Sequence, residues 1–169
     1  MTRDVTLSLD DVRAARDGDP SAFERLYAHY RRMVHAIVLS RVPPRDADDL
    51  VQDVFLTAMQ KLGALRDESA FGGWLATIAR NRAIGSHRSA VELVALEERA
   101  ARGSQEEDEA ARRALAAIQE LPEAYRETLM MRLVEGMTGP EIARQTGLTE
   151  GSVRVNLHRG MKLLREALQ

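Results

Sequence analysis

The stretch from Gly139 to Arg165 constrains the fold more than any other part of the chain. It reads GPEIARQTGLTEGSVRVNLHRGMKLLR and predicts a short helix over residues 140–145, followed by a turn centred on Gly147. Proline suits the first turn of a helix, and glycine accepts the left-handed conformation that such a turn needs. Thr149 is placed to cap a second, longer helix, and Val153 to pack that helix onto the first. The stretch therefore predicts a helix-turn-helix.

The second helix of this motif is basic. Between residues 152 and 165 its charged side chains are Arg154, Arg159, Lys162 and Arg165, with no acid among them. A helix-turn-helix with a basic second helix is typical of proteins that read the DNA major groove. The alternative is an ordinary helical hairpin with a solvated basic face.

Composition excludes several function classes. The chain has 169 residues and no cysteine, which rules out disulfides and thiolate metal sites and favours a reducing compartment. The four histidines are scattered, and no glycine-rich phosphate loop or GxSxG sequence is present. The first residues show no signal peptide, and no apolar run could span a bilayer. We expect a cytoplasmic protein that is not an enzyme and needs no metal or cofactor.

Apolar periodicity predicts an all-α fold. Residues 90–112 interrupt the pattern, because they carry 7 acidic side chains against 3 basic ones and include Gly103-Ser104. We therefore expect two small helical domains, over residues 10–89 and 109–169, joined by a flexible acidic linker over residues 90–108. Within the first domain, Ser21 and Asp46 are expected to cap the second and third helices.

The helix expected over residues 46–62 is strongly amphipathic. One face is apolar and includes Met59, whereas Asp49, Gln52 and Asp53 lie on the opposite face. Taken alone, such an acidic face is more typical of solvated surface than of a binding site.

The helix expected from Trp74 to Arg88 carries basic and polar groups with no acid between them. The loop expected before it carries Phe71 and leads into Trp74, and phosphate contacts beside aromatic rings are the combination that binds single-stranded DNA. The competing interpretation is that a lone tryptophan belongs to the core.

Four stretches in this order resemble one known family. They are GDPSAFERLYAHYRRMV, DADDLVQDVFLTAMQKL, FGGWLATIARNRAIGSHR and the segment from Leu121 to Arg165. The chain resembles the extracytoplasmic-function (ECF) sigma factors of bacterial RNA polymerase, members of the sigma-70 superfamily. The resemblance covers about residues 10–168 and implies sigma domain 2, a linker and sigma domain 4.

The resemblance implies a role for each stretch. The helix over residues 46–62 would bind the clamp helices of the largest polymerase subunit, which makes its acidic face a contact surface. Sigma domain 2 would melt and hold the −10 promoter element, and the helix-turn-helix would read the −35 element as duplex. The implied polymerase contacts are Asp49, Gln52 and Asp53; the −10 contacts are Arg66, Phe71, Trp74, Arg80, Asn81, Arg82 and Arg88; the −35 contacts are Ser152, Arg154, Asn156, His158, Arg159 and Lys162.

The resemblance also implies partners. They are core RNA polymerase, including the flap of its second-largest subunit, promoter DNA, and an anti-sigma factor that would hold the protein inactive. Two rival functions compete with this one: a stand-alone dimeric helix-turn-helix regulator, and a protein-interaction module such as an anti-sigma mimic that uses the fold as a decoy. The first would not need residues 20–88, and the second is disfavoured by the basic character of both DNA-facing stretches.

Overall fold

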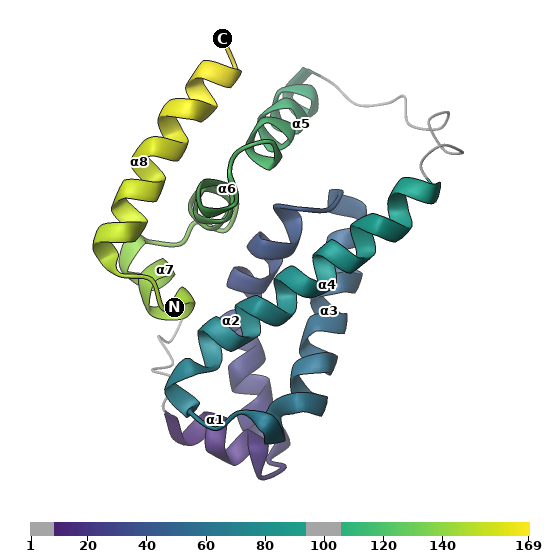
Figure 1. Cartoon of the computed structure of the whole chain (residues 1–169), viewed down its shortest axis with the longest axis vertical. Coiled ribbons are helices and arrows are strands. Elements are labelled where there is room, and N and C mark those ends of the chain that lie inside the picture. The colour runs from purple at the N-terminus through teal and green to yellow at the C-terminus, as the bar shows by residue number, and fades with distance from the viewer. Residues whose placement is uncertain (1–8, 94–105) are drawn as a thin grey trace.

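A computed structural model describes residues 9–93 and 106–169, and within these ranges helices joined by short turns are the only secondary structure. Two helical bundles lie side by side (Figure 1). The N-terminal bundle comprises α1 (Leu9–Arg16), α2 (Pro20–Leu39), α3 (Pro44–Lys61), the short 3₁₀ turns Leu62–Ala64 and Glu68–Ala70, and α4 (Phe71–Leu93). The C-terminal bundle comprises α5 (Glu106–Gln119), α6 (Glu123–Leu129), the π-turn η4 (Met130–Val134), α7 (Gly139–Thr146) and α8 (Glu150–Ala167). The all-α prediction is confirmed. The linker expected over residues 90–108 falls mostly outside the described residues.

Apolar stripes of α2, α3 and α4 meet in the centre of the N-terminal bundle. Leu26, Ile37, Val54 and Leu75 are among the side chains that are fully shielded from solvent there. Each stripe follows the helical repeat, so that one face of each helix is removed from water. The expected helices are therefore present, and their packing leaves one side of α3 and one side of α4 free to carry polar groups.

Two expected caps of the N-terminal bundle are wrong. Asp19, rather than Ser21, caps α2, and its carboxylate accepts a hydrogen bond from the Ser21 backbone N–H at 2.9 Å. Helix α3 begins at Pro44 after Pro43, with no side-chain cap, and Asp46 lies inside the first turn. The reason is the same at both sites: a proline with its φ already near the helical value starts the helix earlier than the polar residue that follows.

The helix-turn-helix is confirmed. Thr138 and Glu141 form a reciprocal capping box at the start of α7, and Gly147 ends this helix with φ of 78°. Thr149 caps α8 by accepting a hydrogen bond from the Ser152 backbone N–H at 3.1 Å. These local contacts fix the angle at which α8 leaves the bundle, with one side of the helix turned to solvent.

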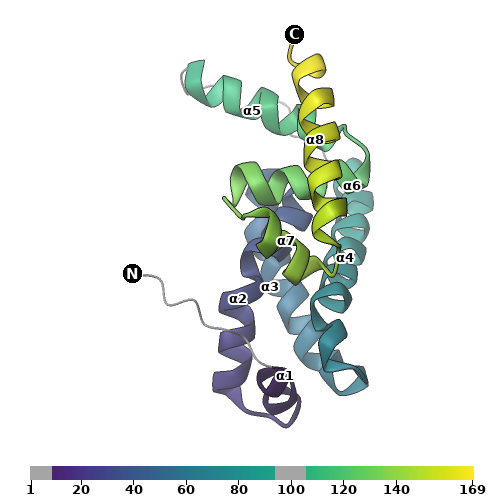
Figure 2. The same ribbon diagram turned by 90° about the vertical axis from the view of Figure 1, so that its left-hand side faces the viewer.

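The two bundles are packed against each other through α2 and α4 on one side and η4 and α7 on the other. Both views show α7 beside these N-terminal helices, while α3 lies on the far side of its bundle (Figures 1 and 2). The Gln119 amide donates to the carbonyl oxygens of Leu39 and Val42, at 2.9 and 3.1 Å. The contact is thus built from specific hydrogen bonds as well as apolar packing. None of the helices in the described ranges is long and apolar enough to cross a membrane.

Candidate nucleic-acid interface

Helix α8 presents a basic surface. The side chains of Arg154, His158, Arg159 and Lys162 are all exposed, and Asn156 is half-buried. Ser152 is exposed, but its hydroxyl accepts a hydrogen bond from the Thr149 hydroxyl at 2.9 Å. The structure therefore brings the expected −35 residues together on one helix, whose C-terminal end projects away from the N-terminal bundle (Figure 1). An exposed helix of this kind can enter a major groove without rearrangement of its own bundle.

Arg80 and Arg82 of α4 differ from the basic residues of α8 in that they have hydrogen-bond partners on other described helices. Arg80 is partly buried, and its Nε and Nη2 donate to Glu127 Oε1 and Oε2 at 2.8 and 2.9 Å. This bidentate pair raises the pKa of the Arg80 guanidinium, which remains charged. Asn81 and Arg82 are exposed, and Arg82 donates to the Thr57 hydroxyl at 2.6 Å. Among these residues, Arg80 alone is covered by the C-terminal bundle.

The remaining basic −10 candidates are Arg66 and Arg88. Arg66 is exposed in the segment between α3 and α4. The backbone of Arg88 belongs to α4, but its side chain lies outside the described residues.

Phe71 does not form the stacking surface expected of it. Its side chain is only 1% exposed, and its ring lies 5.1 Å from that of Tyr30 and 5.7 Å from that of Trp74. Helix α4 begins at Phe71, so this residue shares a helical stripe with Leu75 and Ala79 and faces the core. Phe71 thus supports Trp74, which is half-buried and keeps part of its ring at the surface.

The outer face of α3 holds Asp49, Gln52 and Asp53, all exposed. Two large apolar side chains continue this face along the helix: Leu56 is 52% exposed and Met59 is 51% exposed. The prediction that Met59 belongs to the buried face is wrong, and sequence reasoning missed Leu56. Leu56 follows Asp49 by seven residues and Met59 follows Gln52 by seven, which is a readable signal because residues three, four and seven apart share a helix face. Apolar residues beside a polar rim are typical of protein interfaces.

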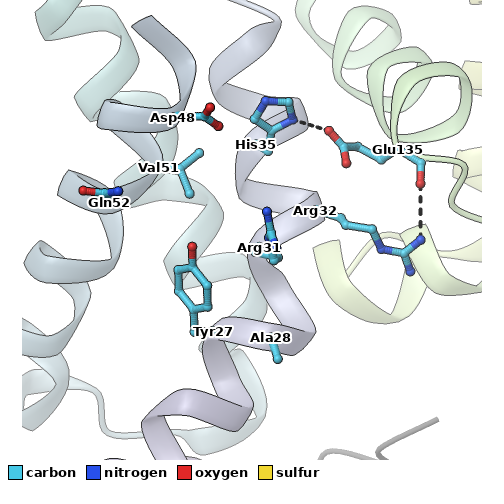
Figure 3. A pocket seen from close by; sticks show the side chains of 9 residues that line it. All are labelled: Tyr27, Ala28, Arg31, Arg32, His35, Asp48, Val51, Gln52 and Glu135. Atoms are coloured by element: carbon cyan, nitrogen blue, oxygen red, sulfur yellow. Dashed lines mark hydrogen bonds and ion pairs between the residues drawn. The ribbon is translucent and has the colours of Figure 1, made fainter. Parts of the chain in front are cut away.

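A groove of about 680 Å³ lies between α2, α3 and the end of η4 (Figure 3). His35 Nδ1 and Glu135 Oε1 are hydrogen-bonded across it, and Arg32 donates to the Glu135 carbonyl at 3.2 Å. The hydrogen bond to Glu135 raises the pKa of His35. Burial and Arg31 lower this pKa, whereas the carboxylates of Glu135 and Asp48 add to the rise. The groove therefore holds a link between the bundles that depends on protonation.

Within the described part of the chain, no group of three or more histidine or acidic side chains could hold a metal ion. The charged groups instead form surfaces and bridges between helices. The exposed surfaces are a basic one on α8 and an acidic and apolar one on α3.

Comparison with known proteins agrees with this arrangement. The Sigma-70 region 2 family matches residues 26–91, and the Sigma-70 region 4 family matches residues 111–164. The chain is 34% identical to RNA polymerase sigma factor CarQ of Myxococcus xanthus over 161 residues, covering 90% of this chain and 92% of the relative. It is 28% identical to ECF RNA polymerase sigma-E factor of Escherichia coli K12, covering 94% and 92% of the two chains.

Two solved structures share the fold. CnrH, in complex with the cytosolic domain of CnrY, matches with a TM-score of 0.65 at 23% identity, over 96% of this chain and 97% of that one. The sigma factor RpoE, in complex with the anti-sigma factor NepR from Bartonella quintana, matches with a TM-score of 0.53 at 22% identity, over 86% and 96%. The two family matches follow the expected order, and CarQ matches this chain over nearly the full length of both proteins. The chain therefore belongs to the ECF group of sigma-70 family RNA polymerase sigma factors.

Proposed function

We propose that this sigma factor docks on core RNA polymerase through the outer face of α3 and selects promoters with α8 and α4. As a sigma factor it is a transcription initiation factor and not an enzyme. The observation that carries the proposal is the separation of two surfaces: an acidic and apolar face on α3, and a basic face on α8. One chain can therefore engage a protein and DNA at the same time.

The polymerase contact rests on charge and apolar area together. Asp49 and Asp53 would face basic groups on the clamp helices of the largest subunit, which gives orientation and specificity. Leu56 and Met59 would supply the apolar surface whose burial gives affinity. A second apolar groove, between η4 and α8, is lined by Leu133, Leu157 and Met161 among others and would receive the flap of the second-largest subunit.

The DNA contacts would be of two kinds. Helix α8 would place its exposed basic and polar residues in the major groove of the −35 element, where bases are read without opening the duplex. Trp74 would stack against an unpaired base of the −10 element, while Arg66, Arg82 and Arg88 hold phosphates. Unstacking a base costs a few kcal/mol, so binding energy from the polymerase contact would support this step.

Regulation by an anti-sigma protein and a cytoplasmic location follow from family likeness. The two structural neighbours were solved with protein partners, and the partner of RpoE is the anti-sigma factor NepR. We extend this kind of partner to the present chain, where the α3 face and the η4–α8 groove offer it apolar surface.

Run-off transcription with core polymerase tests the proposed function. The purified protein added to core enzyme should yield transcripts that start at defined promoters, which neither component yields alone. Promoter-independent initiation with the protein present would refute the proposal. If the free protein instead ran as a dimer on size exclusion and bound duplex DNA tightly, the stand-alone regulator would be the better description.

A further inference from the structure

Acidic residues of the C-terminal bundle cover basic residues of the N-terminal bundle. Glu127 of α6 is only 6% exposed, although it is charged. Besides its bidentate pair with Arg80, it lies 2.6 Å from Nη2 of Arg41, which follows α2. Glu123 adds a second carboxylate, 2.8 Å from Arg41 Nη2 and 3.5 Å from Arg80 Nε. Two carboxylates from α6 thus neutralise two guanidinium groups of the N-terminal bundle.

A DNA phosphate could make the same contacts with these arginines as the two carboxylates make. Arginine binds carboxylate and phosphate with the same planar pair of donors, and a site that holds one is suited to the other. A third guanidinium, that of Arg126, is partly buried in the same cluster, and burial together with Arg41 lowers its pKa. Three arginines this close would repel one another without Glu123 and Glu127. The α6 carboxylates are therefore the groups that make closure of the bundles electrostatically favourable.

A second, uncharged contact joins the bundles at the opposite end of the interface. Gly72, in the first turn of α4, lies so close to α7 that a Cβ atom built on it would be 2.1 Å from the backbone carbonyl oxygen of Gln145. Only glycine permits this approach. The Gln145 side chain also crosses the interface and donates to the His29 carbonyl at 3.1 Å. The neighbouring Gly73 is not so constrained, because its Cβ would meet only the Thr146 carbonyl at 3.8 Å.

We propose that the C-terminal bundle covers the DNA-facing surface of the N-terminal bundle. This closed arrangement is an autoinhibited state. Glu127 and Glu123 pair with Arg80, one of the expected −10 contacts, where a promoter phosphate would bind, and with Arg41, which shares the same two carboxylates. The DNA part of this inference rests on the proposed function; the closure itself rests on the contacts alone.

The closed arrangement is incompatible with simultaneous reading of two promoter elements. Elements centred near −10 and −35 lie about 25 base pairs apart, which is about 85 Å of duplex at 3.4 Å per base pair. In the closed state α7, the first helix of the helix-turn-helix that carries α8, touches α4. The α3 face with Asp49, Asp53 and Leu56 remains open to solvent. Polymerase can therefore dock on the closed form, whereas promoter reading requires the bundles to separate.

The steric contact supplies a matched pair of variants for the first test. Because the chain has no cysteine, Lys61→Cys and Glu166→Cys, both at exposed positions, allow donor and acceptor dyes to be attached to α3 and α8. Gly72→Ala should raise the ratio of open to closed molecules at least about tenfold, seen as a low-transfer population in single-molecule energy transfer. Gly73→Ala makes the same chemical change one residue away and should leave the ratio unchanged. Equal distributions for Gly72→Ala and the parent would overturn the proposal.

The charge contact supplies the second test. Glu127→Gln keeps the shape of the side chain and removes its charge, and Glu109→Gln removes the same charge from an exposed pair within α5. Binding of a fluorescent oligodeoxythymidine of about 20 nucleotides, a sequence-neutral single strand, is measured by anisotropy at low salt. Glu127→Gln and Gly72→Ala should each bind at least about fivefold tighter than the parent, and Arg80→Gln in either background should abolish the gain. Glu109→Gln should bind like the parent.

The outcomes separate this inference from the proposed function. Thermal melting of each variant verifies that both bundles remain folded, and the exposed Glu123→Gln serves if Glu127→Gln melts early. Opening of the bundles without tighter DNA binding would overturn autoinhibition, whatever run-off transcription shows. Conversely, if the parent protein supports no promoter-specific transcription, the sigma-factor mechanism is refuted, whereas the energy-transfer evidence for closure of the bundles is unaffected.

Discussion

Replacing Leu56 by alanine tests the polymerase surface directly. Leu56 is 52% exposed on the outer face of α3, between the acidic residues and Met59. Alanine is the best helix former, so the change should not weaken α3. Because half of the side chain is already in solvent, little core packing is lost. Leu56→Ala should therefore lower the affinity for core polymerase without lowering the stability of the free protein.

The expected magnitude follows from the exposed fraction. Full burial of a leucine side chain contributes about 1.5–3 kcal/mol. With about half of Leu56 available for burial by a partner, its truncation should cost about 0.7–1.5 kcal/mol of binding free energy. At 1.4 kcal/mol per factor of ten, the dissociation constant should rise about 3- to 12-fold.

Competition for core polymerase between labelled parent and unlabelled variant measures this change. Leu9→Ala is the matched control, because Leu9 is 55% exposed on α1, away from the α3 face. The reasoning would be refuted if the two variants competed equally well, because Leu56 would then not be buried against polymerase. A change in melting temperature for Leu56→Ala would show that the residue supports the bundle instead.

Three further predictions address the packing, the bundle link and the recognition helix. Gly160→Val should lower the free energy of unfolding by about 1–3 kcal/mol, because even a Cβ there would lie 3.0 Å from Leu129 Cδ1; an unchanged melting temperature would contradict this close packing of α6 and α8. The pKa of His35 is raised, first by its hydrogen bond with Glu135. The pair therefore adds its full contribution to the free energy of unfolding below the unperturbed pKa of about 6.5, and this contribution is lost as pH rises through the raised pKa. Stability should therefore fall as the pH rises above about 6.5 in urea unfolding, and His35→Gln should flatten that fall; an equal slope in both proteins would exclude the pair as its source. Arg159→Ala should weaken promoter binding by the holoenzyme and, if Arg159 binds a phosphate, reduce the slope of log K against log salt by about 0.9, whereas an unaltered affinity would exclude α8 contact at this position.

Features that depend on neighbours within a turn or two could be predicted from the sequence. Gly147 adopts the left-handed conformation, Thr149 caps α8, and Val153 is buried, as the spacing in the helix-turn-helix requires. The same local rules placed Asp49, Gln52 and Asp53 on one exposed face. The start of α3 differs from the prediction, because Pro44 begins this helix two residues before Asp46.

Tertiary structure decided the features that join distant residues. Phe71 is buried because α4 starts there and turns it toward Tyr30 of α2, and Leu56 is exposed because no neighbouring helix in the described ranges covers that side of α3. Glu127 meets Arg80 across 47 positions of sequence, in a cluster that no local periodicity describes. Helical repeat and capping act over a few residues, so the sequence by itself determined the helices, the helix-turn-helix and the family. Which charged residues are covered, and hence whether a DNA-facing arginine is free or paired, depends on how the two bundles close on each other, and only the packed chain decides it.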